Sequence, residues 1–213
     1  MSAFPEPTPM ELASLIVSKT CHDIISPVGA SSSAMEMWMT ANDDSTREVA
    51  QTLMQKSAAQ AVHKLSFVRL AYGAYGDVGG DVDLGEAMDA TMPYITDDRT
   101  TLAWNLERVI VPKTVAKLAM GLLSLCKDAV PRGGAITIDG TDLTGKVQFT
   151  VRGEAKKVII PQGAEDALSR RFESGIHARN VHLYHLVRLA DEVGVRIEPG
   201  MDDDSITFKT VPA

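Results

Sequence analysis

Two long amphipathic stretches fill the first 73 residues of the chain. Apolar or small residues recur in each at alternating intervals of four and three, which is the spacing of a helix that packs along one side. The pattern predicts two helices, each with one stripe to bury. The stripe positions are Val17, Cys21, Ile24, Val28, Ser31, Met35 and Trp38 in the first stretch, and Met54, Ala58, Ala61, Leu65, Val68 and Tyr72 in the second.

Helix-start signals precede both stretches. Thr8 and Glu11 have the spacing of a capping box, with a proline between them at the first helical position. Ser45 and Glu48 form a second such box after a polar break at residues 41–44. A helical hairpin is therefore expected. Because two helices alone cannot cover both stripes, we expect a second copy of the chain to complete a four-helix bundle, which makes the protein a homodimer.

The pattern changes beyond the hairpin. Residues 74–80 are rich in glycine and predict a linker between a hairpin domain at 10–73 and a second domain at 81–213, while residues 1–9 are expected to be disordered. The predicted fold class is α+β, with the hairpin followed by a small α/β sandwich whose helices cover one face of a sheet. Its expected elements are a short helix capped at 83–86, a strand through Leu102, Trp104 and Leu106, a helix at 114–130, strands at 135–139 and 146–152, helices at 164–172 and 178–193, and strands at 195–198 and 205–211.

Composition excludes several classes of protein. The 213 residues are 45% hydrophobic, enough for a real core, and 21 basic against 28 acidic residues give a net charge of -7, which disfavours nucleic-acid binding. No apolar run approaches the roughly 20 residues that cross a bilayer, and the N-terminus lacks a secretory pattern, so we expect a cytoplasmic protein without membrane contact. Cys21 and Cys126 lie in apolar helical patterns and are interpreted as buried thiols.

One histidine stands out on the first helix. At about 100° per residue, His22 lies on the side opposite the apolar stripe and is expected to face solvent. Small residues with poor helix propensity surround it within roughly 40°, so the helix or loop of another protein can approach closely. These residues are Ser18, Ser26, Gly29 and Ser33.

The neighbours of His22 in the sequence favour chemistry at its ring. Pro27 removes a backbone hydrogen bond to the carbonyl of Asp23 and is expected to bend the helix in this turn. The carboxylate of Asp23 can hold one ring nitrogen of His22, which leaves the other free as a nucleophile that accepts and releases a phosphoryl group. From these residues alone, an ordinary surface histidine is an equally good interpretation.

The segment from His22 to Pro27, HDIISP, resembles the H-[DE]-x-x-[ST]-P box of the dimerisation and phosphotransfer domain of bacterial sensor histidine kinases. The second half resembles the kinase ATPase domain in outline, but Gly121 and Leu125 stand where that family has two asparagines. The segments at 152–156 and 177–181 lack the family's nucleotide-binding aspartate and glycine turn. The resemblance implies a retained scaffold and a lost nucleotide site.

The whole chain resembles the ChpT-type histidine phosphotransferases of alphaproteobacteria. That resemblance implies an enzyme that relays phosphoryl groups through His22, from the receiver domain of a hybrid histidine kinase to response regulators of the cell cycle. Asp23 would orient the ring, and Lys64 or Arg69 on the second helix would offset phosphoryl charge. It further implies no ATP and no other cofactor bound by this chain, with Mg²⁺ supplied by the partner's receiver domain.

Three alternatives remain at this point. The first is a kinase with a divergent but active ATP site, which ATP binding would reveal. The second is a non-catalytic dimeric scaffold, in which replacing His22 would change nothing. The third is a metal site at His177, His182 and His185, which the lack of a fourth ligand at a suitable spacing disfavours.

Overall fold

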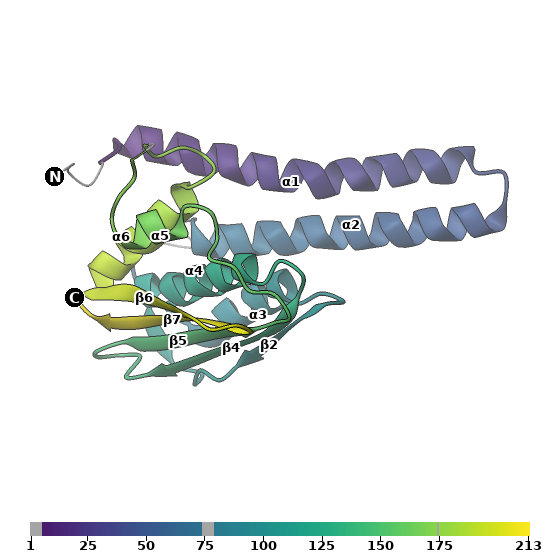
Figure 1. The fold of residues 1–213 in the computed structure, drawn as a ribbon. Coiled ribbons are helices and arrows are strands. Elements are labelled where there is room, and N and C mark those ends of the chain that lie inside the picture. The colour runs from purple at the N-terminus through teal and green to yellow at the C-terminus, as the bar shows by residue number, and fades with distance from the viewer. Residues whose placement is uncertain (1–5, 74–78, 174) are drawn as a thin grey trace.

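The N-terminal part is a long antiparallel helical hairpin (Figure 1). The computed structural model describes residues 6–73, 79–173 and 175–213. Helix α1 spans Pro9–Thr40 and helix α2 spans Asp44–Ala71. The predicted capping box at the start of α1 is confirmed, because the Thr8 hydroxyl accepts from the Glu11 backbone N–H at 3.3 Å and the Glu11 carboxylate accepts from the Thr8 N–H at 2.8 Å.

Two predictions about helix starts are wrong. The second helix begins before Ser45, because Asp43 is its N-cap and its carboxylate accepts from the Thr46 backbone N–H at 2.8 Å. Aspartate caps as well as serine does, so the earlier residue takes the role. The segment predicted as disordered already contains the Thr8 cap and Pro9, the first residue of α1, while residues 1–5 lie outside the described residues.

The C-terminal part is an α+β layer, as predicted (Figure 1). A five-stranded sheet has the order β2-β4-β5-β7-β6, with β2 parallel to β4 and the other neighbours antiparallel. Helices cover the face of the sheet that looks toward the hairpin. The elements are β1 Asp81–Asp83, α3 Leu84–Ile95, β2 Thr100–Trp104, β3 Ile110–Pro112, α4 Lys113–Ala129, β4 Gly134–Thr141, β5 Gln148–Glu154, α5 Ala164–Leu168, α6 Val181–Val193, β6 Val195–Met201 and β7 Ser205–Pro212.

The structure differs from the expected elements in a few places. β1 and β3 pair as a separate two-stranded sheet that the sequence pattern missed, because three residues are too few to show an alternation. Leu106 lies beyond the end of β2, and α5 ends at Leu168, four residues before the predicted end. Of the predicted linker, residues 74–78 lie outside the described residues, and the described glycines Gly79 and Gly80 adopt φ of 82° and 85°.

The end of α2 belongs to the core of the C-terminal part. Phe67, Leu70 and Ala71 are buried in one cluster with residues of α3, α4 and the sheet. Phe67 is 2% exposed and its ring stacks on that of Tyr94, with centroids 4.0 Å apart. The last turns of α2 therefore hold the hairpin against the sheet layer.

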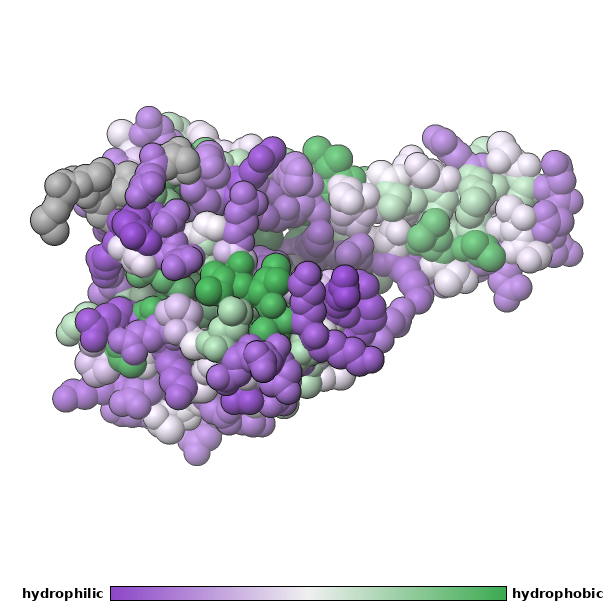
Figure 2. Space-filling view, viewed as in Figure 1, coloured by the Kyte–Doolittle hydropathy of each residue, from purple (hydrophilic) through white to green (hydrophobic). Residues whose placement is uncertain are grey.

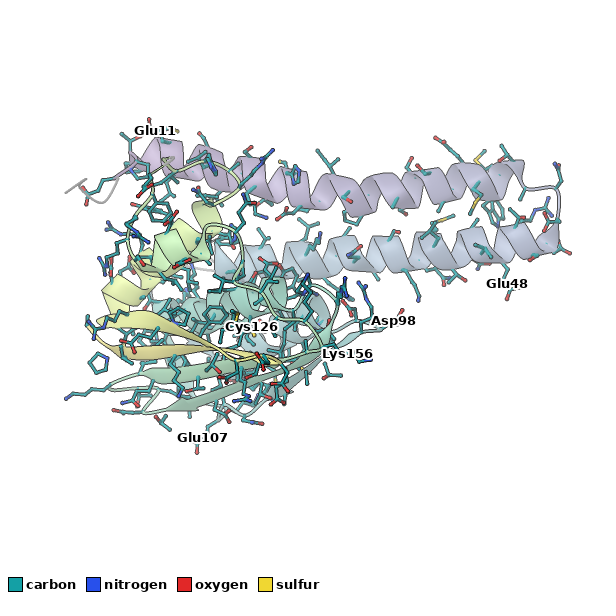
Figure 3. The ribbon with its side chains drawn as sticks, viewed as in Figure 1. Glu11, Glu48, Asp98, Glu107, Cys126 and Lys156 are labelled. Atoms are coloured by element: carbon teal, nitrogen blue, oxygen red, sulfur yellow. The ribbon has the colours of Figure 1, made fainter. Side chains whose placement is uncertain are left out.

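The two cysteines have different environments. Cys126 is buried on α4, as expected, and Figure 3 shows it within the C-terminal layer. Cys21 is exposed on α1, so the prediction of a buried thiol there is wrong for the single chain. The reason is that Cys21 belongs to the apolar stripe, and much of that stripe remains uncovered.

The uncovered stripe follows both helices of the hairpin. Its exposed large side chains are Val17, Val28, Met35, Trp38 and Leu65, whereas Ala61 is buried between the helices. Figure 2 shows apolar surface on the part of the hairpin that extends past the sheet layer. Among the described helices, none combines the length and apolar character needed to cross a membrane.

The stacked ring of Phe67 gives a first testable prediction. Phe67→Ala should lower the free energy of unfolding by about 3–5 kcal/mol, because it leaves a large cavity where α2 meets the sheet layer. Ile110→Ala, at a position 67% exposed on β3, should change it by only about 0.5 kcal/mol. Urea denaturation followed by circular dichroism measures both; equal effects would contradict the assignment of Phe67 to a shared core.

Candidate functional site

His22 lies in the middle of α1 and points into solvent. Its side chain is 88% exposed, as the position opposite the apolar stripe predicts. The ring atom Nδ1 lies 3.4 Å from Oδ1 of Asp23. An Nδ1–H tautomer would donate to this carboxylate and leave the lone pair of Nε2 facing outward.

The small residues around His22 leave the helix surface bare. Ser18, Ser26, Gly29 and Ser33 are all exposed. A Cβ placed on Gly29 would meet no atom of the described residues within 4 Å, so a larger side chain has room at this position. Pro27, one residue from Ser26 but on the inner side, is buried, and α1 runs through it without interruption.

Asp23 is held by two lysines. Lys19, one turn earlier on α1, forms an ion pair with Oδ2 of Asp23. Lys64 of α2 donates from Nζ to the backbone carbonyl of Asp23 at 3.0 Å. Sequence reasoning missed Lys19, although its i,i+4 spacing from Asp23 is a signal that points to the pair.

Arg69 has a different place from Lys64. It lies in a surface hollow on the other side of α2, together with Glu86 and Asp89 of α3, and does not line the space beside Asp23. Of the two basic residues expected near His22, therefore, only Lys64 contacts Asp23, the residue that follows His22.

A cleft of about 300 Å³ separates the hairpin from the C-terminal part directly behind Asp23. Asp128 lines this cleft and is exposed along one side. The protein atoms around its carboxyl raise its pKa to about 6, while the positive charge of Lys19 acts in the opposite direction. Burial also raises the pKa of Tyr94 to about 12. Charged and polar side chains from both parts line the cleft: Lys19, Asp23 and Lys64 on the hairpin, and Tyr94, Lys127, Asp128 and His182 on α3, α4 and α6.

Of the other candidate histidines, His177 is exposed, whereas His182 and His185 are packing residues. Burial lowers the pKa of both His182 and His185 to about 4, with the positive charges of Lys19 and Lys117 acting in the same direction. His185 packs edge-on against the ring of Tyr72, with centroids 5.2 Å apart. Within residues 6–73, 79–173 and 175–213, no three His, Cys, Asp or Glu side chains are grouped to hold a metal ion.

The positions of the two missing asparagines are occupied by apolar packing. A Cβ on Gly121 would lie 2.8 Å from Cδ1 of Leu186, so the leucine side chain of α6 packs directly on the backbone of α4 here. Leu125, one turn later on α4, is 1% exposed. The hollow that remains between these helices and the end of α2 has about 10 Å³, at the lower limit of what one water molecule needs.

Comparison with known proteins gives consistent relatives. Residues 84–205 match the family model of the histidine phosphotransferase C-terminal domain. The protein phosphotransferase ChpT of Brucella abortus (strain 2308) is 33% identical over 201 residues, which cover 93% of this chain and 94% of that protein. A solved bacterial phosphotransferase superposes with a TM-score of 0.86 at 29% identity, over 99% of this chain and 100% of its own.

A more distant likeness concerns the fold alone. The histidine kinase ThkA, solved in complex with the response regulator protein TrrA, superposes with a TM-score of 0.51 at 15% identity. The match covers 95% of this chain and 62% of the kinase chain.

The low pKa values of His182 and His185 predict how stability depends on pH. Because their folded-state pKa values lie below the unfolded value of about 6.5, the stability they contribute is present above that pH and is lost as the pH falls toward 4. Asp128 acts in the opposite direction. Because its pKa is raised in the folded state, its carboxyl destabilises the folded protein while ionised, and this cost disappears as the pH falls through 6. We expect a net loss on the order of 4 kcal/mol across this window.

The measurement is urea denaturation at a series of pH values. In a double variant, His182→Gln with His185→Gln, the loss should vanish or reverse, since only the opposing carboxyl remains. His177→Gln, which removes an exposed histidine, is the matched control, and its stability should depend on pH as that of wild type does. A profile in the double variant that matches wild type would refute the assignment of these two rings.

Proposed function

The chain belongs to the histidine phosphotransferase family, and we propose that His22 is its phosphoacceptor, relaying phosphoryl groups between the receiver domains of a hybrid histidine kinase and of response regulators. The observation that carries this proposal is the exposed ring on a bare helix face, with one nitrogen turned toward a carboxylate. The other described histidines lack this combination of exposure and a carboxylate neighbour beside a docking face.

The chemistry follows from the orientation of the ring. The lone pair of Nε2 attacks the phosphorus of a phospho-aspartate in line, an N–P bond forms, and the P–O bond breaks so that the aspartate leaves as a carboxylate. The proton on Nδ1 stays in place, where Asp23 stabilises the positive charge that builds on the ring. The return step runs in reverse onto the aspartate of the next receiver. We propose that the receiver supplies the Mg²⁺ that neutralises the phosphoryl oxygens.

The hairpin offers the receiver a continuous surface. Ser18, Ser26, Gly29 and Ser33 form one stripe on α1, centred on His22. On α2, Leu53 and Val49 are exposed and continue, at helical spacing, the face that carries Phe67 toward the sheet layer. Figure 1 shows that the sheet layer covers only the half of the hairpin near the chain ends, so this stretch is open for a partner.

We further propose that the chain binds no ATP and carries no phosphoryl source of its own. Contact between Gly121 and Leu186 supports this, because an asparagine side chain on α4 would have to displace a leucine of α6. The divergent kinase is the rival that this packing disfavours. The exposed apolar stripe supports a homodimer, and we place that dimer in the cytoplasm.

The phosphoacceptor assignment is tested by following acid-labile label from a phosphorylated receiver domain. Wild type should become labelled, and His22→Gln should stay below about one hundredth of that level because glutamine lacks the nucleophilic ring nitrogen. His177→Gln, another exposed histidine, should label as wild type does. Label from ATP alone, or label on His22→Gln, would refute the proposal, and an inert wild type would favour the scaffold.

The docking surface is tested at Gly29. Gly29→Ala should raise the free energy of unfolding by about 1 kcal/mol, because alanine favours the helix and nothing obstructs its Cβ. It should leave transfer nearly unchanged. Gly29→Phe should keep the fold but raise the KM for the phosphorylated receiver by about tenfold or more, since a ring there separates the two backbones. Equal KM values in both variants would exclude Gly29 from the docking surface.

A further inference from the structure

Pro27 leaves one backbone acceptor of α1 without its usual partner. In an α-helix the N–H of each residue donates to the carbonyl four residues earlier, and proline has no N–H. The carbonyl that loses its donor to Pro27 is therefore that of Asp23, the residue directly after His22. A helix is weakest where this ladder is interrupted, and here the interruption falls on the turn that carries the reacting ring.

Lys64 supplies the missing donor from the other helix. Its Nζ lies 3.0 Å from the Asp23 carbonyl oxygen, in a half-buried position between α1 and α2. A hydrogen bond from an ionised donor is stronger than the amide bond that it replaces. The bond also crosses between the helices, so it ties the phosphoacceptor turn to α2 instead of to the next turn of α1.

Asp23 is consequently fixed at both its backbone and its side chain. The ion pair with Lys19 holds Oδ2, and the remaining oxygen, Oδ1, faces Nδ1 of His22 at 3.4 Å. A carboxylate held at one oxygen has less freedom to rotate away from the imidazole. The orientation of the ring thus depends on where the backbone of Asp23 sits.

We infer that Lys64 is a positioning residue for His22, which completes the hydrogen bond that Pro27 removes and so holds Asp23 in place to orient the ring. Its ammonium is engaged on a carbonyl and does not act as a ligand of the phosphoryl group. The predicted change in the rate of transfer rests on the proposed function of His22, whereas the predicted change in the orientation of the His22 ring does not.

A double-mutant cycle with Pro27 tests the inference. Lys64→Met should lower kcat for transfer from a phosphorylated receiver by about tenfold and leave KM unchanged, as expected for loss of a charged hydrogen bond. Pro27→Ala restores a backbone N–H, which makes the lysine redundant. In that background Lys64→Met should cost less than about twofold. An equal cost in both backgrounds, which a direct contact with the phosphoryl group predicts, would overturn the inference.

A second measurement does not depend on phosphotransfer or on the Pro27 variant folding. Nitrogen-15 NMR of the histidine rings should show a changed ratio of the Nδ1–H and Nε2–H tautomers of His22 in Lys64→Met, with partial recovery in Lys64→Arg. Lys146→Met, which removes an exposed lysine in the loop between β4 and β5, is the matched control and should leave His22 unchanged. An unaltered His22 signal in Lys64→Met would refute positioning even where wild type accepts no phosphoryl group.

Discussion

The packing of the end of α2 into the core of the sheet layer is the contact on which the rest of the structure depends. Because Phe67, Leu70 and Ala71 share one cluster with the sheet and its helices, the hairpin cannot swing freely from a hinge. This contact sets which side of the hairpin looks toward the sheet layer. Asp23 and Lys19 then line the cleft between the parts, while His22 stays outside it.

That arrangement places the histidines in different environments. Burial keeps His182 and His185 neutral and inside the packing, where they cannot reach a partner protein. His22 is exposed and beside a carboxylate, and the face around it carries little side-chain bulk. A phosphoryl group held in the acidic pocket of another protein can reach a nucleophile only where backbones approach closely, so the small residues matter as much as the ring.

Local signals predicted much of the fold and of the site. The intervals of four and three along the hairpin, together with the Thr8 cap, were enough to predict the two helices. The position of His22 opposite the apolar stripe was enough to predict that its ring is exposed. The pair of strands β1 and β3 was missed because three residues carry no periodicity. Cys21 was misjudged because a stripe does not say whether this chain or another copy buries it. The contact of Lys64 with the Asp23 carbonyl depends on how the helices sit side by side, which no spacing within one helix reveals.

The tight packing of α4 on α6 gives the C-terminal part a role that does not require a bound nucleotide. Where Gly121 meets Leu186, a small residue lets two helices approach until little space remains between them. Close-packed helices hold their surfaces in a fixed relation, because the interior resists deformation. A sheet layer built in this way keeps the end of α2 in place and presents the cleft side of the hairpin in one orientation. For a relay that draws its phosphoryl groups from other proteins, as we propose, this rigidity presents the phosphoacceptor turn to its partners in one orientation.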